Sequence, residues 1–159
     1  KLSNIKLLAM DVDGILTDAG MYYSEKGDEL KKFNTIDGKG IELIRNLGIK
    51  TAIITSENTN IVERRAKKLK IDFLYQGIDR KDIIIKEIAK TQNINLDQIA
   101  YIGDDLNDIS AFKIVGFPIT VKNARKENKS YAKLIVPICG GDGCVRYVCD
   151  LIVNNSINN

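Results

Sequence analysis

The stretch AMDVDGILTD, residues 9–18, follows the apolar run Ile5–Met10 and decides how the fold is interpreted. The run has the length of a buried strand, and it ends where Asp11 and Asp13 place two carboxylates beside the core. Unpaired carboxylates at such a point repel each other and raise each other's pKa. A lone D-x-D is usually a solvated turn, so its meaning depends on the residues at the ends of the other strands.

The composition indicates one compact domain with a substantial core, because 44% of the 159 residues are hydrophobic. No apolar stretch reaches the roughly 18 residues of a transmembrane helix. The N-terminus shows no signal-peptide core, so we expect a soluble, cytoplasmic protein without a membrane partner. The net charge of +3, from 24 basic and 21 acidic residues, is too small for a dedicated nucleic-acid binder.

Histidine is absent, which excludes Ser–His triads, phosphohistidine chemistry and ordinary zinc hydrolysis. A catalytic metal would depend on oxygen ligands, which favours Mg²⁺. Proton transfer would fall to carboxylates or lysine. Cys139, Cys144 and Cys149 form no C-x-x-C pair, and we expect reduced thiols at packed positions.

Apolar runs of strand length alternate with amphipathic stretches along the chain. Strands are expected over 5–10, 49–55, 73–75, 99–102, 117–121 and 134–136, and helices over 40–47, 59–69, 81–91, 105–113, 124–131 and 145–153. Asp79 is expected to cap the third helix, and Gly27 to turn a hairpin between 21–23 and 30–33. The alternation predicts a Rossmann-like α/β fold, a parallel sheet sandwiched by helices, with ligands bound beyond the carboxyl ends of the strands.

Residues whose chemistry is complementary, namely carboxylates, hydroxyls, a glycine and a lysine, follow four of these strands. They are Asp11, Asp13 and Gly14 after the first strand, Thr55, Ser56 and Glu57 after the second, Lys81 after the third, and Asp104, Asp105 and Asp108 after the fourth. Carboxylates that hold a divalent cation, together with a lysine, a hydroxyl and the amides of a glycine turn, provide what a phosphoryl group requires. Each element alone is weak, since G-D-D before a helix can be a simple N-cap, but all four in chain order are hard to assign to chance.

Four stretches carry a family resemblance: DVDGILTD, the apolar run into Thr55, Lys81 and GDDLND resemble the signature motifs of the haloacid dehalogenase-like phosphatases. FNTIDGKGI, LYQG, YIGDDLND and GGDGCVRYVCDLI are similar to the small capless members that dephosphorylate 3-deoxy-2-keto sugar acids. The resemblance covers nearly the whole chain. It implies a single Mg²⁺-dependent phosphatase domain over residues 1–159 with a small hairpin after the first strand and no cap domain.

The resemblance also implies a role for each residue. Asp11 would attack phosphorus and form an aspartyl-phosphate, and Asp13 would act as general acid and then general base. Mg²⁺ would bind to Asp11, to the main-chain carbonyl of Asp13 and to Asp104. Gly14, Thr55, Ser56 and Lys81 would hold the phosphate. Asp105 would support the metal shell and orient Lys81, with the role of Asp108 left open.

Two substrates stay open within this sugar acid class. Arg65 and Lys68 lie about 60° apart on a helix and so share a face, which Glu57 joins if the helical turn begins near it. This set resembles the nine-carbon, sialic acid type of branch, so we expect a 2-keto-3-deoxy-nononate 9-phosphate. The alternative is 3-deoxy-manno-octulosonate 8-phosphate of lipopolysaccharide biosynthesis, which the DGKGI stretch favours. Arg146 could meet the substrate carboxylate.

Capless relatives form tetramers, which implies a homotetramer with a shared barrel built from the hairpin 19–33. The tail and helix 139–159 resemble the family's tail, although Cys144 and Tyr147 replace its usual alanine and glutamate. A cysteine phosphatase loop is disfavoured, because six rather than five residues separate Cys139 from Arg146. A calcium loop fails because Ile15 occupies a ligand position. A catalytically silent scaffold domain remains the alternative of another class.

Overall fold

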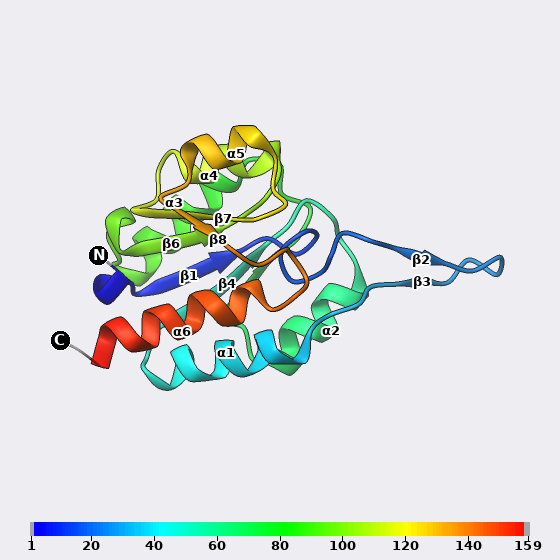
Figure 1. Cartoon of the computed structure of the whole chain (residues 1–159), viewed down its shortest axis with the longest axis horizontal. Coiled ribbons are helices and arrows are strands. Elements are labelled where there is room, and N and C mark those ends of the chain that lie inside the picture. Colours follow the sequence, from blue (N-terminus) through cyan, green and yellow to red (C-terminus); the bar gives the residue numbers. More distant parts are fainter. Residues whose placement is uncertain (1, 158–159) are drawn as a thin grey trace.

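The computed structural model describes residues 2–157, and within them six strands form one parallel sheet in the order β5-β4-β1-β6-β7-β8 (Figure 1). The strands are β1 (Leu7–Met10), β4 (Lys50–Ile54), β5 (Phe73–Tyr75), β6 (Ile99–Ile102), β7 (Phe117–Val121) and β8 (Leu134–Val136). Every neighbouring pair is parallel. The predicted α/β class is confirmed.

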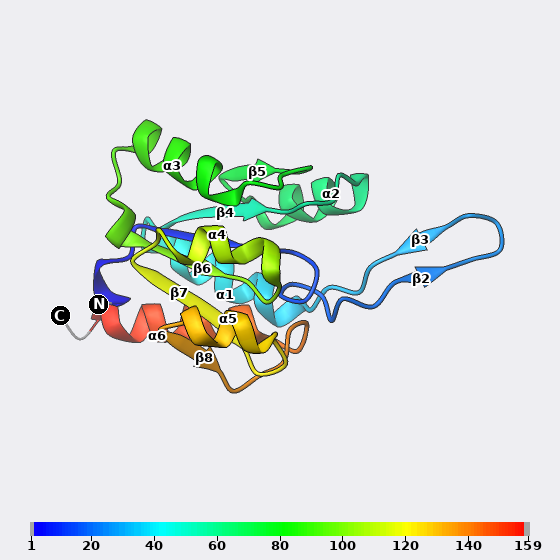
Figure 2. The ribbon, with the colours of Figure 1, turned by 90° about the horizontal axis from the view of Figure 1, so that it is seen from above.

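Helices cover both faces of the sheet, as Figures 1 and 2 show. One face carries α1 (Thr35–Asn46), α2 (Asn60–Leu69) and α6 (Cys144–Ile157), and the other carries α3 (Lys81–Gln92), α4 (Ile109–Phe112) and α5 (Lys126–Tyr131). Short 3-10 turns complete the helical part: η1 (Leu2–Asn4), η2 (Leu96–Gln98) and η3 (Leu106–Asp108). Strand β1 contributes Leu8 and Met10 to one core and Leu7 and Ala9 to the other. Such burial on both faces is expected of a central parallel strand.

A two-stranded antiparallel hairpin, β2 (Tyr22–Tyr23) and β3 (Glu29–Leu30), projects from the body of the molecule (Figure 2). Gly27 lies in its turn with a φ of +91°, a conformation that glycine adopts without strain. Tyr22, Tyr23 and Leu30 are 61%, 69% and 61% exposed. In the described part of the chain, this hairpin follows β1 and no cap domain is present.

The start of α1 and the cap of α3 differ from the sequence-based prediction. Helix α1 begins at Thr35 rather than at residue 40, because the side chain of Asn34 accepts a hydrogen bond from the Ile36 N–H and caps it. Gly40 belongs to this helix, and a Cβ there would lie 2.9 Å from Arg146 Cα, so the glycine permits α1 to pack closely on α6. The predicted cap Asp79 is wrong. Helix α3 has Arg80 as its N-cap residue, without a capping side-chain hydrogen bond.

The remaining elements follow the prediction closely, except that the helix expected over 105–113 is divided into η3 and α4. All three cysteines are free, and Cys144 and Cys149 are buried, as expected of packed thiols. Across residues 2–157 no helix has both the length and the apolar character needed to cross a membrane.

Candidate active site

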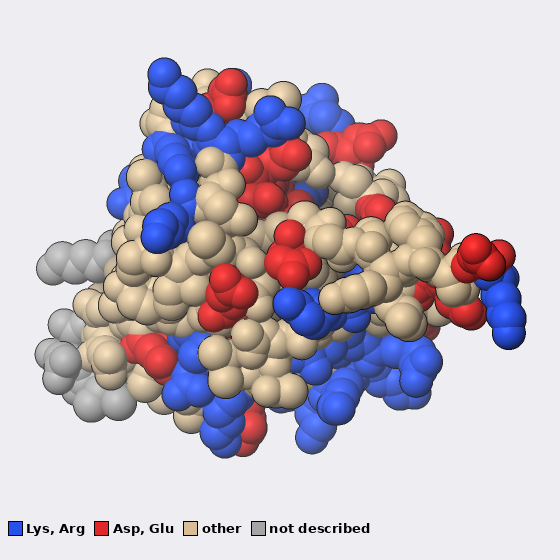
Figure 3. Space-filling model, turned by 45° about the vertical axis from the view of Figure 1, so that its right-hand side comes forward, with Lys and Arg blue, Asp and Glu red and all other residues tan. Residues whose placement is uncertain are grey.

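The residues that follow these four strands meet at one edge of the sheet, because β5, β4, β1 and β6 are consecutive neighbours. A cavity of about 450 Å³ lies at this edge. Its lining comprises Asp11, Asp13, Ala19, Thr55, Ser56, Glu57, Asp104, Asp105, Leu106 and Asn107. Figure 3 brings the right-hand side of Figure 1 forward and shows acidic side chains gathered in the upper middle of that face. The position agrees with the rule for ligand sites in parallel sheets.

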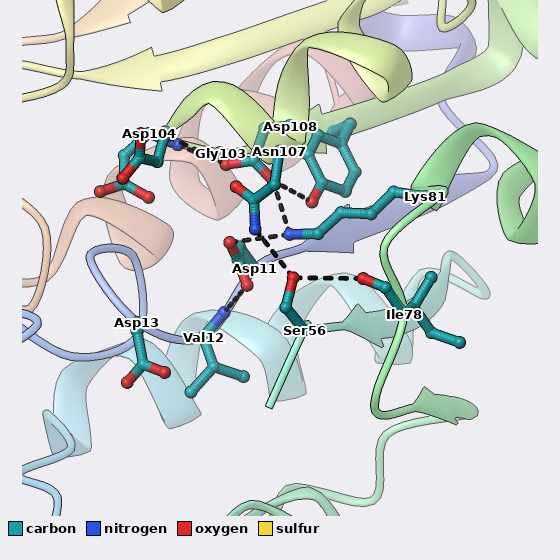
Figure 4. A network of polar contacts seen from close by, with 12 residues as sticks. Asp11, Val12, Asp13, Ser56, Ile78, Lys81, Gly103, Asp104, Asn107 and Asp108 are labelled. Carbon is teal, nitrogen blue, oxygen red and sulfur yellow. Dashed lines mark hydrogen bonds and ion pairs between the residues drawn. The ribbon is translucent and has the colours of Figure 1, made fainter. Parts of the chain in front are cut away.

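Lys81 is the charged centre of this edge. It is the first residue of α3, its side chain is fully shielded from solvent, and its Nζ lies 2.8 Å from Asp11 Oδ2 and 2.6 Å from Asp108 Oδ1 (Figure 4). Burial lowers the pKa of Lys81, but Asp11 and Asp108 outweigh that effect and hold it above its ordinary value. Lys81 is therefore a permanent cation beside the Asp11 carboxylate.

Asp108 organises the surrounding network. Its Oδ1 accepts hydrogen bonds from Lys81 Nζ and from the Tyr101 hydroxyl, each at 2.6 Å. Its Oδ2 accepts from the main-chain N–H groups of Asp104 at 2.8 Å and Asp105 at 3.2 Å. Asp108, not Asp105, thus orients Lys81, which corrects the sequence-based expectation. The Asp105 carboxylate instead pairs with Arg125 Nε at 2.7 Å.

The carboxylates of Asp11, Asp104 and Asp108 lie together, with one oxygen of each within 4.8 Å of the others. Burial first, and next the charge of Asp108, raise the pKa of Asp11 and of Asp104 to about 7. Lys81 alone does not balance three carboxylates. Asp104 Oδ1 is buried without a hydrogen-bond partner among the described residues. An excess of negative charge and an unpartnered oxygen fit a hard divalent cation.

Glycines bring the backbone close to this cluster. Gly14 has a φ of +84°, and a Cβ there would lie 2.0 Å from Asp104 Oδ2. A Cβ at Gly140 would lie 1.7 Å from the carbonyl oxygen of Gly14, so the C-terminal loop packs directly on the loop that follows β1. A side chain at either position would displace the loop that carries Asp13.

Asp13 lies at the mouth of the cavity, and Figure 4 shows its carboxylate directed away from Asp11. Both of its oxygens bind Lys31 Nζ, at 2.6 and 2.8 Å, and the same Nζ lies 2.5 Å from Glu57 Oε2. The sequence did not single out Lys31, because the residue sits at the base of the hairpin, 18 residues from Asp13 and 26 from Glu57. No local pattern reports such a contact.

Thr55 and Ser56 stand at the end of β4, beside the acidic cluster. Thr55 is buried, and its main-chain groups are fixed by Tyr75 and Ile78. Ser56 Oγ donates to the Ile78 carbonyl at 3.1 Å and accepts from Asn107 Nδ2 at 2.9 Å (Figure 4). Asn107 is a further lining residue that sequence reasoning missed.

The expected substrate-binding residues do not all share this cavity. Glu57 lines it, but Arg65 and Lys68 line a separate groove of about 370 Å³, which we call the basic groove. Its lining is Leu30, Lys31, Phe33, Ile61, Arg64, Arg65 and Lys68. Arg146 binds Asp150 on its own helix at 2.8 Å and lines neither space.

The hydrogen-bonding groups of Arg65 are partly engaged within the fold. Its Nη2 donates to the Asn34 carbonyl at 3.1 Å, and its guanidinium lies 5.3 Å from the centre of the Phe33 ring. Helix α2 begins at Asn60, so the condition under which Glu57 would share a helical face with Arg65 is not met.

An aspartate held against a buried lysine, next to an acidic cation site at the strand ends of a parallel sheet, defines a phosphoryl-transfer enzyme. Comparison with known families agrees, since residues 58–147 match the haloacid dehalogenase-like hydrolases. The chain belongs to this family and is a phosphoric monoester hydrolase.

Within this family, the chain is similar to a particular group of sugar acid phosphatases. The chain is 40% identical over 153 residues to the 3-deoxy-D-manno-octulosonate 8-phosphate phosphatase of Yersinia pestis, covering 96% of this chain and 82% of that one. A structure of the Moraxella catarrhalis phosphatase of the same name, in complex with magnesium, phosphate and KDO, superposes with a TM-score of 0.96 at 41% identity, covering 99% of this chain and 90% of that one. The structure of the cobalt-bound Haemophilus influenzae phosphatase superposes with a TM-score of 0.93 at 32% identity, covering 98% of this chain and 91% of that one.

Proposed function

We propose that this chain hydrolyses the phosphate ester of 3-deoxy-D-manno-octulosonate 8-phosphate with the help of Mg²⁺. The observation that carries the proposal is the cluster of Asp11, Asp104, Asp108 and Lys81 at adjacent strand ends. The eight-carbon substrate is supported by the names of the similar phosphatases from Yersinia pestis and Moraxella catarrhalis. These names favour the eight-carbon ester, the alternative in the sequence analysis, over the nine-carbon ester that the sequence analysis preferred.

Asp11 is the proposed nucleophile. Its Oδ1 accepts the Val12 N–H at 2.7 Å and its Oδ2 faces Lys81, so the carboxylate is fixed before substrate binds. Attack forms the bond between a carboxylate oxygen and phosphorus as the bond between phosphorus and the sugar oxygen breaks. Lys81 stabilises the negative charge that spreads over the phosphoryl oxygens.

Asp13 is the proposed acid and base. In an in-line displacement the departing oxygen leaves on the side of phosphorus opposite the nucleophile. Asp13 lines the cavity with its carboxylate directed away from Asp11, which suits that position (Figure 4). Asp13 takes up a proton from solvent and passes it to the departing sugar oxygen, and its carboxylate then accepts a proton from the water that hydrolyses the aspartyl-phosphate.

Asp11, Asp104 and the main-chain carbonyl of Asp13 are the proposed ligands of Mg²⁺, which supplies compensation for the negative charge of the phosphoryl group and the carboxylates. Asp108 has no free oxygen for the metal, since each oxygen already accepts two hydrogen bonds, and it is proposed to hold Lys81 and the Asp104 main chain in place. Asp105 is proposed to support the metal site indirectly, since its N–H donates to Asp108 Oδ2.

The phosphate is proposed to bind to the Gly14 amide, Thr55 and Ser56, all of which stand beside the acidic cluster at strand ends. For the sugar, Glu57 is the proposed hydrogen-bond acceptor within the cavity. Arg65 and Lys68 line the basic groove and Arg146 lines neither space, so these three residues are not part of the proposed sugar site. The exposed side chains of Tyr22, Tyr23 and Leu30 on the hairpin support the proposed homotetramer, because they would otherwise remain in water.

The test is a comparison of kcat/KM for the eight-carbon 8-phosphate and the nine-carbon 9-phosphate in Mg²⁺. We expect the eight-carbon ester to be hydrolysed at least tenfold more efficiently. Phenyl phosphate serves as a reference without a sugar acid, and Asp11→Asn controls for contaminating phosphatases. Preference for the nine-carbon ester would overturn the chain-length proposal, and equal rates for all three esters would overturn the sugar acid class.

A further inference from the structure

Lys31 forms a bridge between two carboxylates at the cavity mouth. Its Nζ lies 2.6 and 2.8 Å from the two oxygens of Asp13 and 2.5 Å from Glu57 Oε2. The side chain is fully shielded from solvent, whereas those of Asp13 and Glu57 are 31% and 53% exposed. Burial lowers the pKa of Lys31, but its bonds to the two carboxylates outweigh this and keep the pKa above the ordinary value. Lys31 is a stable cation here.

The bridge also ties the projecting hairpin to the sheet. Lys31 directly follows β3, Asp13 follows β1, and Glu57 follows β4. Lys31 lines the basic groove, whereas its two partners line the catalytic cavity, so the bridge forms the wall between the two spaces. Thr17 Oγ1 donates to Asp13 Oδ1 at 3.4 Å, a longer contact that cannot fix the carboxylate by itself.

We propose that Lys31 is a positioning residue for the general acid, and that Glu57 in turn holds Lys31 in place. By binding both Asp13 oxygens, Lys31 keeps this carboxylate on the outer side of the cavity, where the departing oxygen of an in-line displacement lies. Misplacing a catalytic group by about 1 Å can cost about a hundredfold in rate. The inference rests on the proposed role of Asp13 but adds a residue from the hairpin to the machinery.

The experiment compares two sugar-free esters, phenyl phosphate and p-nitrophenyl phosphate, which differ in how much the departing oxygen needs a proton. Phenoxide is the more basic leaving group and requires the acid more. For Lys31→Met in saturating Mg²⁺, we expect kcat/KM to fall by about 10- to 100-fold with phenyl phosphate. The fall with p-nitrophenyl phosphate should be at least fivefold smaller. The parameter kcat/KM is chosen because it reports the steps up to cleavage of the ester.

Lys32→Met is the matched control, since Lys32 is the next residue, is 58% exposed and pairs with Asp18 at 3.1 Å outside the cavity. Its activity on both esters should equal that of the unmodified protein. Glu57→Gln should reproduce the selective loss in weaker form, because Lys31 then loses one of its charged partners. Circular dichroism of each variant establishes that it is folded.

Equal losses on both esters, no loss, or a greater loss on p-nitrophenyl phosphate would overturn the positioning role of Lys31. A general effect of its charge on phosphate binding would produce equal losses. Failure of the unmodified protein to hydrolyse either ester in Mg²⁺ would instead count against the proposed phosphatase site, so the two failures are distinguishable.

Discussion

Asp108→Asn is a demanding test of the buried network, because a carboxylate accepts more hydrogen bonds than a carboxamide. Asp108 accepts from Lys81 and Tyr101 at one oxygen and from the N–H groups of Asp104 and Asp105 at the other. Asparagine has one acceptor oxygen and an NH₂ group that only donates. In one orientation of the amide, the N–H groups of Asp104 and Asp105 lose their acceptor. In the other, the Tyr101 hydroxyl loses its acceptor and Lys81 keeps only Asp11.

The cost arises from these lost partners. A buried donor left unsatisfied costs about 1–3 kcal/mol, so two of them cost about 2–6 kcal/mol. Removing a carboxylate also relieves repulsion, since Asp108 is a cause of the raised pKa of Asp11 and of Asp104. We therefore expect the free energy of unfolding in Mg²⁺ to fall by about 2–4 kcal/mol. In EDTA no cation offsets the repulsion between the carboxylates, so removing one of them relieves more repulsion. The free energy of unfolding should therefore fall by less than in Mg²⁺.

The assay is urea unfolding followed by circular dichroism at neutral pH, in Mg²⁺ and in EDTA. Asp150→Asn is the matched control, because that carboxylate is 45% exposed and pairs with Arg146 at the surface. Such a pair contributes about 0–1 kcal/mol. A loss for Asp108→Asn in Mg²⁺ no larger than that for Asp150→Asn, or a gain in stability, would refute the reasoning.

The other predictions concern chemistry, metal and assembly. Asp11→Asn should abolish turnover and Asp13→Asn should lower kcat at least ~10²-fold, and a near-normal rate in either purified variant would contradict the mechanism. EDTA should silence the enzyme and Mg²⁺ restore it. Because the folded protein raises the pKa of Asp11 and Asp104 to about 7, it binds more protons than the unfolded chain, so metal-free stability should fall as pH rises from about 4 to 7. Thermal unfolding should accordingly show greater stabilisation by Mg²⁺ at pH 8 than at pH 5, and an equal effect at both would disprove the charge argument. Sedimentation should show a tetramer that Tyr22→Ser with Tyr23→Ser dissociates; a monomeric, active unmodified protein would remove the proposed assembly.

The sheet was predictable because each parallel strand is a short apolar run followed by polar residues of a distinct kind. The strands 99–102, 117–121 and 134–136 have the predicted bounds. The start of α1 was missed because Gly38 and Gly40 are poor helix formers, and only the packing of α1 on α6 explains the second of them. Tertiary contact outweighs intrinsic propensity there.

Within the site, the residue types at the strand ends were predictable, but their pairing was not. The partner of Lys81 depends on the 3-10 turn η3, which carries Asp108 back beneath the strand end and turns Asp105 toward Arg125. Lys31 could not be found at all, because its contacts depend on where the base of the hairpin meets the sheet. Glu57 could join the face of Arg65 and Lys68 only if the helical turn began near it, and that condition is not met because α2 begins at Asn60.

The contact between Gly14 and Gly140 has a consequence for the order in which the enzyme matures. The ribosome makes Asp11 before strands β4 to β8, and the loop around Gly140 that closes on it after them. Strand β1 occupies the middle of the sheet, yet its neighbour β6 and the cation-binding Asp104 are translated long after it. During that interval Asp11 and Asp13 are ordinary hydrated carboxylates. A chain that stops before Gly140 therefore carries the nucleophile without the loop that closes on it.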